Sequence, residues 1–135
     1  MKETMEKNLW KDKKVCIIDD DEDIREIYSV KFMAEEFVVM AARNGQEGLD
    51  VIRKERPDVI LLDIQMPVKD GFEVLRELST DQVLKKIPVI ILSNIDDERA
   101  FKKIGDFSTH FYLIKSLVTP QKVVDAVRET LRDTA

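Results

Sequence analysis

Carboxylates, a hydroxyl and an ammonium group each follow directly after a short apolar run of the sequence. Asp19 and Asp20 come after the first run, Asp63 after the third, Ser93 after the fourth and Lys115 after the fifth. Crowded carboxylates repel one another, and Mg²⁺, a hard cation that prefers oxygen ligands, relieves that repulsion. One carboxylate can then act as a nucleophile towards a phosphoryl group and form an aspartyl phosphate. The ammonium would neutralise one phosphoryl oxygen, and the hydroxyl would donate to another.

The apolar runs that carry these residues are predicted to be strands of one parallel sheet. Each run is continuous rather than alternating, which is typical of a strand buried on both faces. The runs are Val15–Ile18, Phe37–Ala41, Val59–Leu62, Val89–Leu92 and Phe111–Ile114. A segment of helical spacing follows each run, and the last begins at Thr119-Pro120, a cap followed by proline. This order predicts helices on both faces of a sheet whose ligands bind beyond the carboxyl ends of the strands.

Composition argues against several classes of protein. The 135 residues suit one domain. A formal net charge of −5, without a long block of lysine or arginine, disfavours direct binding of nucleic acid. The single cysteine, Cys16, lies within an apolar run, so we expect a core residue and a reducing compartment. No stretch is long enough to cross a bilayer, and we therefore expect a cytoplasmic protein that does not bind membranes.

From about Val15 to Leu131 the chain resembles the response regulator receiver domain of two-component signal transduction. The resemblance rests on several fragments that occur together in the family's order and spacing, although each fragment alone is weak. The fragments are Asp19-Asp20-Asp21 with Arg25, Val59–Asp63 with Met66-Pro67 and Asp70-Gly71, Pro88–Ser93, and Tyr112–Lys115. The family implies a flavodoxin-like (βα)₅ three-layer sandwich with a five-stranded parallel sheet of order 2-1-3-4-5. Residues 13–135 would form the receiver domain, and residues 1–12 a charged N-terminal extension.

The resemblance also implies a phosphorylation and metal site. Asp63 would be the phosphoacceptor and a ligand of Mg²⁺. Asp20 would bind the ion directly and Asp19 largely through water, with the backbone carbonyl of Gln65 as a further ligand. Gly71 is expected to permit a tight turn into the helix that follows this loop.

Three residues beyond the acidic cluster would respond to the phosphoryl group. The resemblance implies that Ser93 is the switch hydroxyl and that Lys115 is the partner of the phosphate. Tyr112 would be the aromatic residue whose rotamer follows the switch, although a plain core aromatic is the simpler interpretation.

The implied function is a phosphorylation-dependent signalling switch. The phosphoryl group would come from a histidine kinase, a phosphotransfer protein or a small-molecule donor, and the domain would catalyse only its own phosphorylation and hydrolysis. It would not be a stand-alone enzyme. The signal would leave through the face made by the last two helices and the fifth strand. The receiver of that signal would be a separate protein or an output domain absent from this chain, and a phosphorylation-dependent dimer stays open.

The sequence departs from the family pattern at three places. Asn94 follows Ser93, where a small residue is usual, and Ser116 follows Lys115, where proline is usual. A cis bond before Ser116 is therefore not expected, because the cis form is costly without proline. The stretch Gly105–His110 is interpreted as longer than the usual connection into the fifth strand.

Other interpretations of these residues stay open. Asp19–Asp21 suit the N-terminus of a helix, and Ser93 could cap the next helix, although Asp96 is better placed to do so. A degenerate receiver that binds partners without phosphorylation is the main alternative function. A phosphohydrolase would commonly carry a second aspartate at the position of Gln65. A flavin module would need a glycine- or hydroxyl-rich loop after the first run, so both rivals are less favoured.

Overall fold

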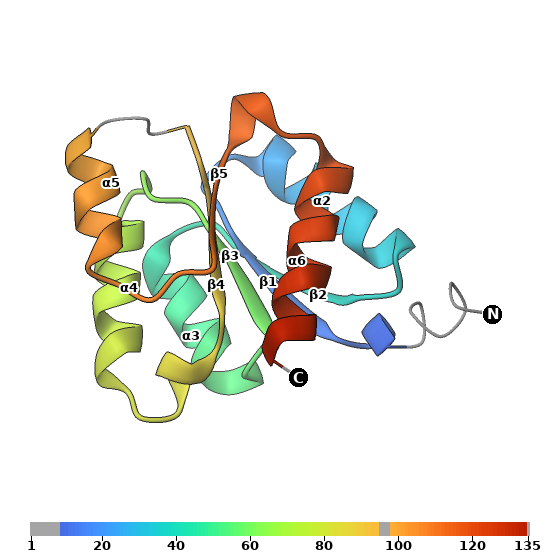
Figure 1. Cartoon of the computed structure of the whole chain (residues 1–135), viewed down its shortest axis with the longest axis horizontal. Coiled ribbons are helices and arrows are strands. Elements are labelled where there is room, and N and C mark those ends of the chain that lie inside the picture. Colours follow the sequence, from blue (N-terminus) through green and yellow to red (C-terminus); the bar gives the residue numbers. More distant parts are fainter. Residues whose placement is uncertain (1–8, 95–97, 135) are drawn as a thin grey trace.

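Five parallel strands form a single sheet of order β2-β1-β3-β4-β5 (Figure 1). The computed structural model describes residues 9–94 and 98–134. The strands are β1 Lys14–Ile18, β2 Val38–Ala42, β3 Val59–Leu62, β4 Val89–Ser93 and β5 Phe111–Ile114. The helices are α2 Glu22–Ala34, α3 Gly45–Glu55, α4 Gly71–Thr80, α5 Glu98–Gly105 and α6 Pro120–Thr134, with 3₁₀ turns η1 Leu84–Lys86 and η2 Lys115–Leu117. The predicted flavodoxin-like fold and strand order are confirmed.

Helices cover both faces of the sheet and produce two cores. On one face α2 and α6 pack against side chains such as Val15, Ile17 and Leu61. On the other face α3, α4 and α5 pack against Cys16 and Ile18, among others. Successive residues of a strand point to opposite faces, so every residue of a central strand must be apolar. The continuous apolar runs of the sequence follow from this arrangement.

The second strand begins one residue later than predicted. The apolar run predicts Phe37 as its first residue, but β2 begins at Val38. Phe37 is buried instead against Phe32, with the two ring centroids 5.2 Å apart in an edge-to-face arrangement. Its backbone N–H donates to the carbonyl of Phe32, which closes the C-terminal end of α2. An apolar run cannot distinguish a strand residue from a buried residue of the preceding turn.

The N-terminal segment contributes one side chain to the core. Trp10 is only 4% exposed and belongs to the core on the α2 and α6 face. The guanidinium of Arg132, in the last turn of α6, lies over its ring, 5.7 Å from the centroid. Trp10 falls within the predicted charged extension 1–12, yet it anchors the chain beside the start of β1.

Helix caps agree with the signals in the sequence where the structure describes them. Thr119 accepts a hydrogen bond from the backbone N–H of Lys122, and α6 begins at Pro120 as predicted. Asp21 caps α2 by accepting from two backbone N–H groups of the first turn, so it acts as a helix cap. Asp96, the predicted cap of α5, lies outside the described residues. No helix in the described part of the chain is both long and apolar enough to span a bilayer.

Candidate functional site

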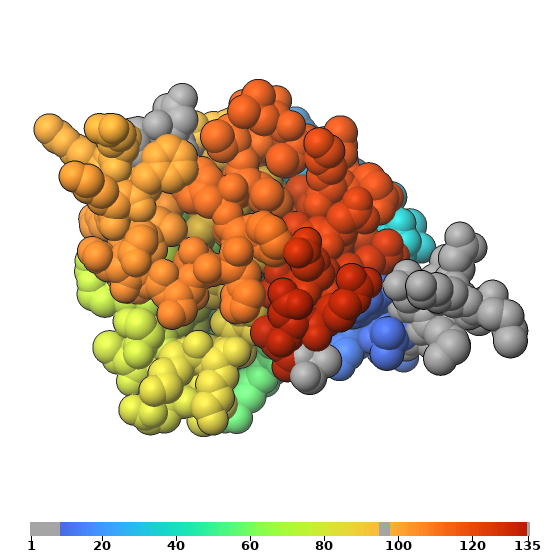
Figure 2. Space-filling view, viewed as in Figure 1, coloured from blue at the N-terminus to red at the C-terminus, as the bar shows by residue number. Residues whose placement is uncertain are grey.

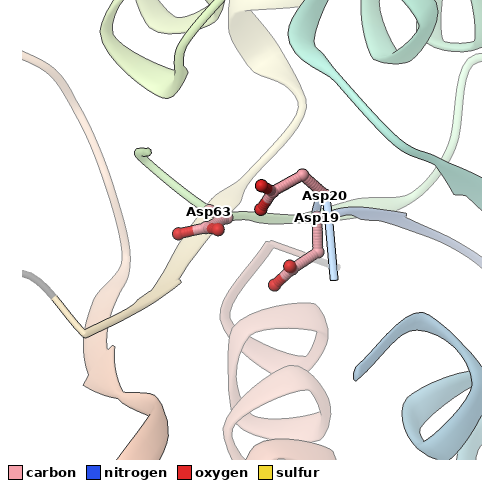
Figure 3. A group of neighbouring side chains, drawn as sticks. All are labelled: Asp19, Asp20 and Asp63. Atoms are coloured by element: carbon pink, nitrogen blue, oxygen red, sulfur yellow. The ribbon is translucent and has the colours of Figure 1, made fainter. Parts of the chain in front are cut away.

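Three carboxylates meet at the carboxyl edge of the sheet. One carboxylate oxygen from each of Asp19, Asp20 and Asp63 lies within 4.8 Å of the other two (Figure 3). Asp19 and Asp63 are buried, at 2% and 5% exposure, whereas Asp20 is exposed. Residues far apart in the sequence meet here because β1 and β3 are neighbours, with Ile18 paired to Leu62 in register.

The backbone holds the two buried aspartates as continuations of the sheet. The N–H of Asp19 donates to the carbonyl of Ala42 over 3.0 Å, and the N–H of Asp63 donates to the carbonyl of Ile18 over 2.9 Å. Each aspartate therefore extends the parallel ladder by one residue beyond its strand. Arg25 also donates to the backbone carbonyl of Asp19 over 2.8 Å. The sequence marked Arg25 only as part of a motif, and the signal for this contact was a cation one helical turn beyond the acidic triplet.

The ammonium of Lys115, the residue directly after β5, contacts two of the three carboxylates. Its Nζ lies 2.5 Å from Asp19 Oδ2 and 3.1 Å from Asp63 Oδ2. Burial by itself would lower the pKa of the lysine, but the two carboxylates outweigh burial and raise it. Burial raises the pKa of Asp19, and the lysine offsets this only in part. In the folded protein, Lys115 is therefore a cation at neutral pH.

The two oxygens of Asp63 have different neighbours. Oδ1 accepts from the backbone N–H of Ile64 over 2.8 Å, and Oδ2 accepts from Lys115. The carboxylate is thus fixed in orientation by the main chain on one side and by the ammonium on the other. Such pre-orientation favours reaction, because less conformational freedom is lost when a donor arrives.

The loop after β3 approaches the site closely at Gly71. A Cβ atom at this position would lie 2.5 Å from the carbonyl oxygen of Asp63. None of the described glycines has a positive φ, so the expected reason for this glycine, freedom to turn, is wrong and the reason is space. The left-handed residue of the loop is Val68, with φ 68°. Gln65 is exposed in the same loop, and its carbonyl as a metal ligand stays a prediction.

Ser93 and Tyr112 lie on the neighbouring strands β4 and β5. Ser93 is the last residue of β4, is 1% exposed and pairs in register with Ile114. Tyr112 is half-buried, and its ring centroid lies 4.6 Å from that of Phe101 of α5. In the sequence, Phe101 is part of a short apolar stripe at helical spacing. Its contact with the predicted switch aromatic depends on how α5 packs beside β5.

The two substituted positions of the family pattern contact each other. The side-chain oxygen of Asn94 accepts a hydrogen bond from the backbone N–H of Ser116 over 3.0 Å. The Lys115–Ser116 bond is trans, as expected. Beyond these residues, α5 ends at Gly105 and β5 begins at Phe111, and the greater length of this connection stays a prediction.

The donor set fits a hard divalent cation. Three carboxylates and one ammonium leave a formal charge of −2 at the cluster, and carboxylate oxygens are the ligands that Mg²⁺ prefers. Asp20 is exposed, so the cluster can be reached from solvent. Lys115 neutralises only part of the negative charge of these carboxylates. A bound cation would lower the repulsion that remains between them.

Comparisons with known proteins identify the family of this chain. The family model described as "Response regulator receiver domain" matches residues 15–128. The chain is 31% identical over 121 residues to the polar-differentiation response regulator DivK of Brucella anthropi, covering 90% of this chain and 98% of that protein. It is also 31% identical over 121 residues to "Probable transcriptional regulator ycf27" of Guillardia theta, but it spans only 46% of that protein.

A solved structure agrees with this assignment. The phosphorylated cyanobacterial phytochrome response regulator RcpA superimposes with a TM-score of 0.79 at 31% identity, covering 92% of this chain and 96% of that one. The family match includes every site residue described above, from Asp19 to Ser116. The chain belongs to the response regulator receiver domain family of two-component signal transduction.

Proposed function

We propose that this domain is a signalling switch that accepts a phosphoryl group on Asp63. The observation that carries the proposal is the placement of the Asp63 carboxylate, buried beside Asp19, Asp20 and the ammonium of Lys115. A carboxylate whose charge is partly neutralised, and which is held in one orientation, is suited to attack phosphorus. RcpA, a relative of the same fold, crystallised in a phosphorylated form, which supports the proposal.

The phosphoryl donor would be the phosphohistidine of a kinase or phosphotransfer protein, or a small acyl phosphate. An oxygen of Asp63 attacks phosphorus, the bond from phosphorus to the donor breaks, and the donor keeps the electron pair. The switch resets when a water oxygen attacks the same phosphorus and the bond to Asp63 breaks. Lys115 would stay protonated, and its ammonium beside Asp63 Oδ2 would neutralise negative charge on a phosphoryl oxygen.

Mg²⁺ is the cofactor that these residues would hold. Asp20 and Asp63 would bind it directly, Asp19 largely through water, and the backbone carbonyl of Gln65 would complete the protein ligands. When bound, the ion supplies positive charge that offsets the charge of the phosphoryl oxygens as they approach the carboxylates.

The signal would leave through the surface of α5, β5 and α6. Residues of these elements lie side by side over one face of the molecule, in orange and red in Figure 2. Tyr112 belongs to this surface on β5, and Ser93 lies on β4, between β5 and the strand β3 that precedes Asp63. When Asp63 is phosphorylated, Ser93 and Lys115 would make new contacts with the phosphoryl group. These contacts would shift the domain from its inactive towards its active conformation. The partner would be a protein or an output domain, with no direct contact to nucleic acid or membrane.

Intact mass after incubation with acetyl phosphate and Mg²⁺ tests the proposal. We expect wild type to gain one phosphoryl group only when Mg²⁺ is present. We expect Asp63→Ala to gain none, while Asp125→Ala, which removes an exposed carboxylate of α6, behaves as wild type. A wild type that gains nothing from acetyl phosphate, from a phosphohistidine donor or from beryllofluoride would overturn the proposal. That outcome would favour a degenerate receiver that acts without phosphorylation.

A further inference from the structure

One side-chain hydrogen bond joins the ends of β4 and β5 beside the proposed phosphorylation site. Ser93 and Ile114 are the last paired residues of these strands. One residue further along, Asn94 Oδ1 accepts from the backbone N–H of Ser116 over 3.0 Å. The side chain of Asn94 therefore continues the ladder where the two backbones diverge. The two bonded residues directly follow Ser93, the buried hydroxyl, and Lys115, the ammonium that contacts Asp63.

The turn that carries Lys115 has little packing to hold it. No residue of η2 is buried, and no side-chain hydrogen bond caps it. Leu117, its last residue, is 74% exposed. The ammonium of Lys115 must nevertheless stay within 3.1 Å of Asp63 Oδ2. An exposed turn with few apolar contacts samples several conformations unless a specific bond restrains it, and the Asn94 bond restrains the peptide directly after Lys115.

We propose that Asn94 is a positioning residue for Lys115. Its amide oxygen holds the Ser116 N–H and so keeps the η2 turn in the conformation from which the ammonium reaches Asp63. The inference rests on the proposed function, because it explains how quickly Asp63 accepts a phosphoryl group. Asn94 acts through Lys115 and contacts neither the donor nor the phosphoryl group.

A steric role for Asn94 makes the opposite prediction. If this exposed side chain merely narrowed the approach to Asp63, Asn94→Ala would speed phosphorylation, whatever stands at position 116. The positioning role predicts slower phosphorylation, and only when position 116 carries an N–H. The geometry favours positioning, because the amide oxygen accepts from the backbone of the η2 turn rather than pointing free into solvent.

Amide hydrogen exchange of the metal-free protein tests the bond directly. We expect the Ser116 N–H to exchange faster in Asn94→Ala than in wild type, by roughly three- to tenfold, which corresponds to the loss of one hydrogen bond. Asn94→Asp keeps an acceptor oxygen and should restore the protection. Equal exchange in wild type and Asn94→Ala would overturn the proposal whether or not either protein folds less stably.

Phosphorylation kinetics with acetyl phosphate test the consequence. Asn94→Ala should lower the maximal phosphorylation rate roughly three- to tenfold, with the half-saturating Mg²⁺ concentration unchanged, because the substitution removes no carboxylate. Ser116→Ala removes only the hydroxyl and should match wild type. In the Ser116→Pro background, which lacks the donor N–H, Asn94→Ala should have no further effect.

The outcomes separate this inference from the proposed function. A wild type that takes up no phosphoryl group overturns both. A wild type that is phosphorylated no faster than Asn94→Ala overturns the positioning role alone, as does an acceleration by Asn94→Ala in both backgrounds. Slower phosphorylation in Asn94→Ala that disappears in the Ser116→Pro background supports it.

Discussion

Gly71 shows how a single residue limits the shape of the site. Its N–H donates to the carbonyl of Ile64 over 2.8 Å, which draws the start of α4 against the residue that follows Asp63. The hydrogen that replaces a side chain at Gly71 faces the carbonyl of Asp63, with no room for a carbon atom. The sequence motif identified the glycine, but its reason is the approach of two segments rather than a left-handed backbone.

Gly71→Ala is expected to destabilise the domain by about 1–3 kcal/mol, the usual cost of overpacking. The Cβ would force either α4 or the backbone at Asp63 to move. Gly105→Ala is the matched control, because a Cβ at this last residue of α5 meets nothing within 4 Å. Urea unfolding of the three proteins measures the difference, and similar stabilities for both variants would contradict the explanation.

Cys16 confirms the simpler interpretation of a lone cysteine. It is fully buried in β1, and burial raises the pKa of its thiol to about 12. The thiolate, which is the reactive form, is therefore scarce at neutral pH. Cys16 serves as a small core residue of the sheet.

Between elements, charged side chains tie α2 to α6. Glu35, at the C-terminal cap of α2, accepts from Arg128 of α6 over 2.9 Å and from Lys31 over 3.1 Å. Burial alone would raise the pKa of the Glu35 carboxyl, but hydrogen bonds from the two cations outweigh burial and lower it. Both helices cover the same face of the sheet, so this contact closes the edge of that core.

Glu35→Gln is expected to lower the free energy of unfolding by about 0.5–1 kcal/mol near pH 7. A carboxyl whose pKa is lower in the folded state adds stability above its unfolded pKa, about 4.3, and loses it as the pH falls through the folded value. The difference between wild type and variant should therefore shrink in acid. Glu36→Gln, at an exposed neighbouring position, is the control, and urea unfolding between pH 3 and 7 gives the profile. A difference that stayed constant with pH would argue against the ion pair.

At the scale of the whole molecule, the fold gathers negative charge at one end of the sheet. Parallel strands send their carboxyl ends to the same edge, and two adjacent strands there end in aspartates. Burial raises the pKa of Asp19, and the charge of the neighbouring Asp63 adds to the rise. Burying these carboxylates costs some stability, which a bound cation would restore.

Mg²⁺ is expected to stabilise the folded domain. At ten times its dissociation constant the free energy of unfolding should rise by about 1.4 kcal/mol, from the general relation for a ligand that binds only the folded state. Asp20→Asn removes an exposed carboxylate of the cluster and should abolish the rise, whereas Asp125→Asn should keep it. Thermal unfolding with and without Mg²⁺, with NaCl at equal ionic strength as reference, provides the measurement. An equal rise in NaCl would show general screening rather than a site.

Local patterns in the sequence determined the elements and the types of group at the site. All five apolar runs matched the strands β1 to β5 to within one residue at each end, because a strand buried on both faces leaves a continuous signal. The side chains directly after these runs could be named as site residues, because a parallel sheet brings the carboxyl ends of its strands to one edge. The family motifs then added roles that no periodicity contains.

Tertiary structure alone decided which of those groups touch. The contact of Lys115 with Asp19 and Asp63, the bond between Asn94 and Ser116, and the burial of Trp10 each join segments that no local pattern relates. Such contacts depend on strand register and helix packing, where a shift of one residue reverses the face of every side chain. The sequence alone therefore determined which chemical groups this protein has at its site, and the packed sheet decided the distances at which they act.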